Sequence, residues 1–479
     1  MPDPVIIPGR AAPDGITWWT LARATAPAVR LVGEPQATVT VHPLEALDQG
    51  MHAFLLATTN LAPDRRCTLE VTDAEGTVAR AASRTLPAAL TPGTPFTIAL
   101  GSCYNWPMDI DEAGRWFPPK AHAPDGADPL RLGVLLGDQV YMDLKKSIDA
   151  VKEDSWSEPM PKAPDPWKAY QQQWSDRRHR NLLGRAGCGF LCLADDHEMW
   201  NDWPHRPLWL GWTKGDEGRA LERELLNAFD VFQAALNLPP GVVAAAGAIT
   251  HTLIRAEGLS FSFDVPPLSF FVFDTRIGRT RADTPGAVRF TDPAHLQAAV
   301  NWLHRPGGLG ILAVAAPVFQ GRGSAFDHNL ADYEADYRVL VDALNTARRP
   351  VIVLSGDIHR SRLYALFLGT QELPTALEFV SSPFSRLKEP PGIDPPSGEP
   401  VVQGILGESG ARFKLANTDP GPGGPRPFVT TARQTYGTIS FTSDGGNGLA
   451  TVLRCWGRPV RQRDGAALLL QHTRTWAVT

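Results

Sequence analysis

The sequence predicts a mixed α/β (α+β) protein in two parts, a small β-sandwich followed by a larger layered α/β part. Residues 1–92 hold short β-branched or alternating segments separated by Asn, Pro, Asp and Gly, which is typical of strands and turns. From residue 96 onward, uniformly apolar runs alternate with helical patterns. Strands that are buried on both faces of a layered fold have this uniform character. A chain of 479 residues has room for two or three folding units.

The first part is expected to be a small Ig-like β-sandwich over residues 1–92. Its clearest strands, at a spacing that suits a sandwich, are residues 36–41, 52–58 and 67–71. The stretch LPAALTPGTP at 86–95 contains three prolines and one glycine, which indicates a linker. We therefore expect a second domain over residues 96–479.

In the second part, six apolar runs predict buried strands, namely FTIALGSC, LRLGVLLGD, GFLCLADD, FFVFDTR, GILAVAAP and VIVLSGDIH. Helical patterns cover residues 167–183, 216–238 and 329–347. Another helix should begin at Pro293, because Asp292 is a good N-cap and proline suits the first helical position. From about residue 412 the chain returns to strand-like segments such as YGTISF and ATVLRCW.

The composition gives no electrostatic reason to expect nucleic acid as a stable partner. Hydrophobic residues make up 43% of the chain and charged residues 20%, as in ordinary globular proteins. The formal charge is −5 and the isoelectric point is about 6.2, so no net positive field attracts a polyanion. A small anionic substrate would need a local positive site, supplied by metal ions or arginines.

The cysteine count and the N-terminal segment bear on the compartment. The five cysteines are few and odd in number, which argues against a disulfide framework and for a reducing compartment. No charged and then apolar leader opens the chain, and no window approaches the roughly 18 apolar residues of a membrane span. We expect no transmembrane segment and a cytoplasmic location for the chain as given, or a periplasmic or secreted one if a leader was removed. The sequence does not indicate the oligomeric state.

Chemistry is expected where the apolar strands end. Loops from several strands converge at the carboxyl ends of α/β sheets, on a rigid base. Carboxylates that gather in one place repel one another, and cations offset that repulsion. Five runs finish in residues able to bind metal or phosphate, namely Gly-Ser-Cys103, Gly-Asp138-Gln-Val-Tyr141, Asp195-Asp196-His197-Glu198, Asp274-Thr-Arg276 and Gly-Asp357-Ile-His359.

Each ending also has a purely structural interpretation. A Gly-Asp pair after a strand is commonly a turn, and the acids at 195–198 would suit a helix N-terminus. Cys103 alone would be an inert buried thiol, and Asp357 with His359 a capped turn. Five such endings in one chain favour a shared site over coincidence.

Taken in order, the motifs GSC at 101–103, GDQVY at 137–141, DDHE at 195–198 and SGDIH at 355–359 resemble those of the PhoD-type alkaline phosphatases. These enzymes are a branch of the dinuclear metallophosphoesterase superfamily. FDTR at 273–276 resembles the family's arginine-bearing strand end. The resemblance covers about residues 96–386 and implies a metallophosphatase-type domain of two packed β-sheets flanked by helices.

The resemblance implies a dinuclear centre. Asp138 would bridge the two metals, and Cys103 and Tyr141 would bind Fe(III), with further ligands from Asp357 and His359. Thiolate and phenolate donate strongly to Fe(III), and a trivalent cation favours the loss of their protons. A divalent metal, calcium, zinc or manganese, would occupy the second position.

The remaining motif residues are assigned in the same way. Asp196 takes the place of the superfamily's usual metal-binding asparagine, and Asn201, just after DDHE, is a further candidate ligand. His197 would give a proton to the leaving alkoxide. Arg276 would hold a phosphate oxygen through its fork of N–H donors.

The expected activity is that of a PhoD-like alkaline phosphatase or phosphodiesterase, in which a metal-bound hydroxide hydrolyses a small phosphate mono- or diester. The alternatives are a phospholipase-like diesterase and a non-catalytic metal-binding protein with the same fold. The chain departs from the family in its short N-terminal part and in the absence of an export signal. Gly-Ser-Cys103 stands where the wider superfamily has Asp-x-His, which leaves the metal identity open.

Tryptophans are concentrated around the DDHE segment. They predict a packed helical layer, in which Cys188 and Cys192 are core residues. In the alternative interpretation, Trp200 and Trp203 line a pocket for an apolar leaving group.

Overall fold

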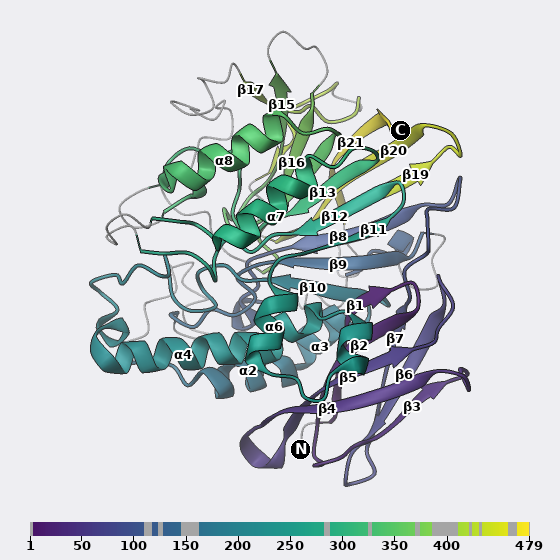
Figure 1. The fold of residues 1–479 in the computed structure, drawn as a ribbon, viewed down its shortest axis with the longest axis vertical. Coiled ribbons are helices and arrows are strands. Elements are labelled where there is room, and N and C mark those ends of the chain that lie inside the picture. The colour runs from purple at the N-terminus through teal and green to yellow at the C-terminus, as the bar shows by residue number, and fades with distance from the viewer. Residues whose placement is uncertain are drawn as a thin grey trace.

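The described residues of the structure, a computed structural model, form four β-sheets, with helices over the two larger ones (Figure 1). It is a mixed α/β fold with a β-sandwich and a layered α/β part, as the sequence predicts. It describes residues 3–109, 117–122, 128–144, 162–281, 288–323, 328–368, 374–385, 411–420, 424–430, 434–457 and 467–478.

The N-terminal strands form two small antiparallel sheets, with the orders β1-β2-β5-β4 and β3-β6-β7. Trp18 and Leu56 of the first sheet share one buried core with Leu69 and Val71 of the second, so the two sheets form the predicted sandwich. The strands are β1 (Val5–Ala12), β2 (Gly15–Ala22), β3 (Ala28–Val32), β4 (Thr38–Ala46), β5 (His52–Thr59), β6 (Arg66–Thr72) and β7 (Val78–Arg84).

A six-stranded sheet follows, with the order β10-β9-β8-β19-β20-β21. Its first three strands are parallel, and β19 is antiparallel to β8. The sheet therefore joins motif-bearing strands to the C-terminal tail. Its strands are β8 (Phe96–Gly101), β9 (Leu130–Leu136), β10 (Gly189–Leu193), β19 (Thr435–Ser443), β20 (Gly448–Gly457) and β21 (Ala467–Ala477).

An eight-stranded sheet packs against it, with the order β11-β12-β13-β14-β16-β15-β17 and β18 paired to β15. Strands β12, β13, β14 and β16 are parallel. Its strands are β11 (Phe261–Val265), β12 (Leu268–Val272), β13 (Leu309–Ala313), β14 (Val351–Ser355), β15 (Ser361–Leu368), β16 (Ala376–Val380), β17 (Ala411–Leu415) and β18 (Val429–Thr430).

Alternating side chains along the strands build the layers. Ile98 and Leu100 of β8 lie in the core between the two large sheets, together with Ile311 and Ile352. Ala99 points to the opposite face, into a core shared with the helices of residues 166–258. Each parallel strand is thus apolar on both faces, which is why its sequence reads as one uniform run.

Helices cover the outer faces of both large sheets (Figure 1). Four helices share a core with the six-stranded sheet, namely α2 (Pro166–Ser175), α3 (Arg177–Gly184), α4 (Gly215–Phe232) and α6 (His251–Gly258). The short helix α5 (Pro240–Ala245) packs instead on β5 and β2 of the N-terminal sheet. On the eight-stranded sheet lie α7 (Pro293–Leu303) and α8 (Glu334–Asn345).

Three of the four predicted helices differ from the structure in detail. Residues 167–183 form two helices instead of one, because the Asp176 side chain accepts a hydrogen bond from the N–H of Arg178 and caps α3. The helix expected over 216–238 ends at Phe232 and continues as a 3₁₀ turn over Ala234–Asn237. The pattern at 329–347 divides into a 3₁₀ turn over Leu330–Asp332 and α8. The start predicted at Pro293 is confirmed, with Asp292 as the cap.

The two parts of the chain are in contact. The sandwich ends at Arg84 and β8 begins at Phe96, on either side of the predicted linker. However, β1 packs against β10, and one core cluster runs from Trp18 to Ile311. The division at residues 92–96 therefore stays a prediction.

All five cysteines are free and buried. Cys188 and Cys192 belong to the core that the helices share with the six-stranded sheet, as predicted. Among the helices that the structure describes, none has both the length and the apolar character that a membrane crossing requires.

Two motif glycines allow loops from different strands to touch. A Cβ on Gly137, whose φ is +86°, would lie 2.5 Å from Cβ of Asp195, and a Cβ on Gly356 would lie 2.4 Å from Cβ of Ser102. Contacts this close exclude any side chain at either position. The loops after β8, β9, β10 and β14 consequently converge at one edge of the paired sheets.

Candidate metal centre

Asp138 lies at the middle of the candidate site, directly after β9, and its side chain is buried. Its Oδ2 atom lies 3.5 Å from Sγ of Cys103 and 3.3 Å from the hydroxyl of Tyr141. Its Oδ1 atom accepts a hydrogen bond from the backbone N–H of His197 at 3.3 Å. The two oxygens of one carboxylate therefore face two different sets of residues.

The first set combines a thiol, a phenol and an imidazole. The Tyr141 hydroxyl lies 3.4 Å from Nε2 of His359, and Sγ of Cys103 lies 3.2 Å from the carbonyl oxygen of Asp357. Ser382 donates its hydroxyl to the same sulfur at 3.1 Å. Burial and the neighbouring Asp138 carboxylate raise the pKa values of Cys103 and Tyr141 well above their ordinary values, so a cation is needed for either to ionise.

A separate group of carboxylates also surrounds Asp138. Oxygen atoms of Asp138, Asp195, Asp196 and Asp357 lie within 4.8 Å of one another. Burial raises the pKa of Asp138 well above its usual range; His197 lowers it, and Asp196 raises it further. Buried carboxylates at this spacing stay charged only beside positive groups. Arg276 is such a group for Asp195, and bound cations would serve the others. The donors around Asp138 fit metal ions, because they combine a polarisable thiol and a phenol with hard carboxylate oxygens.

The backbone at these residues has unusual dihedral angles. Cys103, Asp138, Asp357 and His359 all have positive φ, between 50° and 70°. Non-glycine residues rarely adopt this left-handed region, and they do so mostly where a functional geometry is held by its surroundings. The hydrogen bonds and the close loop contacts described above supply that support.

His197 is paired with Asp143. Nδ1 of His197 lies 2.8 Å from Oδ1 of Asp143, and its ring packs on the ring of Tyr141 with centroids 4.3 Å apart. Burial alone would lower the pKa of His197, but the carboxylates of Asp143, Asp196 and Asp138 outweigh it and raise the pKa well above the ordinary value. The imidazole is therefore a proton-carrying group beside the carboxylates.

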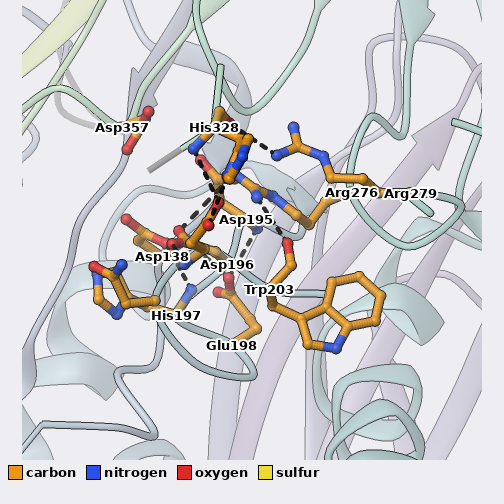
Figure 2. A network of polar contacts seen from close by, with 12 residues as sticks. Asp138, Asp195, Asp196, His197, Glu198, Trp203, Arg276, Arg279, His328 and Asp357 are labelled. Carbon is orange, nitrogen blue, oxygen red and sulfur yellow. Dashed lines mark hydrogen bonds and ion pairs between the residues drawn. The ribbon is translucent and has the colours of Figure 1, made fainter. Parts of the chain in front are cut away.

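Glu198, the last residue of DDHE, binds the main chain of the motif loops. Its carboxylate accepts hydrogen bonds from the backbone N–H groups of Asp138 at 3.0 Å, Gln139 at 2.6 Å and Asp195 at 2.9 Å. Burial raises the pKa of Glu198 to about 7. One buried side chain thus fixes the backbones of two motif loops (Figure 2).

Comparison with known proteins identifies the fold. No family model matches the sequence, and no curated protein does. A solved structure described as "Structure of PhoD" superposes on the chain with a TM-score of 0.59, covering 99% of this chain and 90% of that one. The chain has a PhoD-like fold. At 16% identity the likeness concerns the fold, and the resemblance seen in the motifs is confirmed at that level.

Within the PhoD-like fold, Arg276 forms a buried ion pair. Its Nε donates to Oδ1 of Asp195 at 2.6 Å, and Nη1 donates to the carbonyl of Trp203 at 2.9 Å. Nη2 lies 4.0 Å from Asp196. These contacts (Figure 2) hold the guanidinium against DDHE, and its expected role as a phosphate ligand stays a prediction.

Asn201 approaches the site through its main chain. Its backbone N–H donates to Oδ2 of Asp143 at 2.9 Å, the carboxylate that also holds His197. Its role as a metal ligand stays a prediction. Trp200 and Trp203 are buried and contribute to the core between the helices and the sheet, which supports the packed layer rather than an open pocket wall.

Sequence reasoning missed the roles of Asp143, Glu198 and Asp195. Asp143 lies only two residues beyond Tyr141, so an acid so close to the motif could have been considered as a partner for His197. Nothing in the sequence indicated that Glu198 points back to main-chain N–H groups, because that contact depends on how two loops meet.

Proposed function

We propose that this protein is a metal-dependent hydrolase of small phosphate mono- or diesters, with Fe(III) and a divalent metal, calcium, zinc or manganese, as cofactors. The PhoD-like fold supports a phosphoesterase. The geometry around Asp138 is the observation that carries the proposal, because its carboxylate lies against a thiol and a phenol and within 4.8 Å of three further carboxylates.

The residues divide between the two metals by chemistry. Cys103 and Tyr141 adjoin Oδ2 of Asp138. His359 lies beside the Tyr141 hydroxyl, and the three side chains together suit Fe(III). Asp196 and Asp357 lie with Asp138 in the carboxylate set and suit a divalent ion. When bound, such ions would make a water molecule more acidic and neutralise phosphate charge.

The protein's own residues would then act on the ester. His197, protonated through its pairing with Asp143, is placed to give a proton to the leaving oxygen. Glu198 keeps the loops of Asp138 and Asp195 in register. Arg276 fixes Asp195, and we expect its fork of N–H donors to hold a phosphate oxygen as well.

The test is a substrate panel combined with metal analysis. Purified protein is assayed on p-nitrophenyl phosphate and bis-p-nitrophenyl phosphate, alongside Asp138→Asn and a control variant, Asp64→Asn. Asp64 is matched because it too is an aspartate with positive φ, 54° against 56° for Asp138, but it belongs to the N-terminal part. Turnover that depends on metal and on Asp138, but not on Asp64, supports the proposal. Metal-loaded protein inactive on both substrates would overturn it.

A further inference from the structure

A second cluster of metal-binding side chains lies beside the candidate centre. It consists of Asp202, His205 and His328, whose nitrogen and oxygen atoms lie within 4.8 Å of one another. Asp202 and His205 come from the loop after β10, and His328 comes from the segment that leads into α8. None of the three has a role in the function proposed above.

Both imidazoles lie against the same oxygen of Asp202. Nδ1 of His328 lies 2.8 Å from Oδ2 of Asp202, and Nδ1 of His205 lies 3.5 Å from the same oxygen. The two imidazole rings stack with centroids 4.0 Å apart and an angle of 16° between their planes. Ligands bonded to a tetrahedral zinc ion lie about 3.3 Å from one another, given Zn–N and Zn–O distances of about 2.0–2.1 Å.

Main-chain contacts hold each ligand in place. Asp202 adopts a φ of 62°, and its Oδ1 accepts the backbone N–H of His328 at 2.9 Å. The backbone N–H of His205 donates to the carbonyl of Asp202 at 2.9 Å. Arg279 donates through Nη1 to the carbonyl of His328 at 3.1 Å, as Figure 2 shows. The cluster is therefore preorganised, as a metal site requires.

Burial and donor type indicate which ion would fit. The Asp202 side chain is 5% exposed, whereas His205 and His328 are 17% and 22% exposed, so an ion can enter from the imidazole side. Two imidazoles with one carboxylate suit a borderline ion such as Zn²⁺ rather than Ca²⁺ or Mg²⁺, which take oxygen ligands. Three protein ligands also leave a fourth tetrahedral position for a small molecule.

We propose that Asp202, His205 and His328 form a zinc site separate from the dinuclear centre. The two sites are neighbours, because the backbone N–H of Asp202 donates to Oδ2 of Asp196. Their ligand sets share no residue, so the zinc site does not depend on the phosphoesterase proposal.

The first experiment measures Zn²⁺ and Co²⁺ binding in the Asp138→Asn background, in which the dinuclear centre is impaired. We expect one equivalent of Co²⁺ with the visible spectrum of a tetrahedral ion, displaced by Zn²⁺. His328→Gln and His205→Gln should each abolish this equivalent. His251→Gln is the matched control, because His251 lies 3.0 Å from Oδ2 of Asp230 in an ordinary His–Asp pair, and it should leave binding unchanged.

The second experiment needs no variant and uses the full wild-type chain. Carbethoxylation of histidines by diethyl pyrocarbonate is mapped by mass spectrometry with and without Zn²⁺. Zinc should protect His205 and His328 several-fold, while His251, which is 40% exposed, should react equally in both samples. Unprotected His205 and His328 at saturating zinc, or loss of the Co²⁺ equivalent in His251→Gln, would overturn the proposal.

Discussion

The carboxylate of Glu198 accepts a hydrogen bond from the backbone N–H of Asp138 at 3.0 Å, so the last residue of one motif fixes the first ligand of another. Both oxygens of Glu198 are engaged by donors. Its Oε2 atom also accepts the backbone N–H of Asp195. Its Oε1 atom accepts the backbone N–H of Gln139 and the side-chain amide of Gln233, so the loops after β9 and β10 meet at this carboxylate. Glu198 is therefore a positioning residue.

Glu198→Gln should lower metal affinity and turnover by roughly 10–100-fold, as changes to residues that orient metal ligands do. The reason is that both oxygens of Glu198 accept hydrogen bonds from N–H groups. In either orientation of the glutamine side chain, its NH₂ group would face such donors and could not accept from them. Glu378→Gln is the matched control, since Glu378 is also buried and binds the N–H groups of Val318 and Phe319. Metal content and turnover are measured at equal folded fraction. Equal losses in the two variants would mean that Glu198 contributes only stability.

Asp138→Asn should abolish turnover and lower the metal content while the fold persists. An amide retains the shape of the side chain but removes the negative charge that two cations would share. Asn also tolerates positive φ, so the backbone at 56° is not strained. Circular dichroism, metal analysis and turnover are compared with Asp64→Asn. A variant that keeps both metal and wild-type turnover would show that Asp138 is not the bridge.

His197→Ala should slow turnover by about 10²–10⁴-fold while the metals stay bound, as expected for loss of a general acid. The loss should be smaller for p-nitrophenyl esters than for alkyl esters, because a good leaving group needs less protonation. His251→Ala, another histidine paired with an aspartate, should leave turnover unchanged. If both classes of ester slow equally, His197 acts by some means other than proton donation.

Cys103 and Tyr141 should give the purified enzyme a visible charge-transfer band if they bind Fe(III). Cys103→Ser should shift or weaken the band because oxygen replaces a polarisable sulfur, and Tyr141→Phe should weaken it by removing the phenolate. The thiol should resist alkylation until the metal is chelated, since its lone pairs are engaged. Cys67→Ser and Tyr337→Phe, at two other buried positions, should leave the spectrum unchanged. A colourless, iron-free and fully active enzyme would leave the phosphoesterase proposal standing but remove its iron site.

His179 should make the fold sensitive to acid. Burial lowers the pKa of this histidine from 6.5 to about 3, so the unfolded chain takes up the proton first. Its contribution to stability is therefore complete above pH 6.5 and is lost as the pH falls toward 3, by up to about 1.4 kcal/mol for each pH unit. His179→Phe keeps an aromatic ring between Tyr104 and Trp174 and should flatten this dependence. The free energy of unfolding in urea is measured for both proteins, after treatment with a chelator, between about pH 7 and pH 5. Identical slopes of this free energy against pH in the two proteins would contradict the prediction.

The layers of the fold and the positions of the motifs could be predicted from local sequence patterns. Uniform apolar runs such as LRLGVLLGD became strands buried on both faces, because side chains alternate between two cores along each parallel strand. The same runs place Cys103, Asp138 and Asp357 after strand ends, where a site was expected. Asp292 and Pro293 fixed a helix start because capping is a local interaction.

The contacts between motif residues could not be predicted in this way. Glu198 reaches the backbone of Asp138 across 60 positions of sequence, and His328 reaches Asp202 across 126. No local pattern encodes such pairs, since they arise from the packing of loops on two sheets. The same is true of Arg276, whose buried guanidinium meets Asp195 only because the end of β12 lies against the end of β10. Sequence periodicity reports on a residue's own strand or helix, whereas the chemistry of this site depends on the contacts between them.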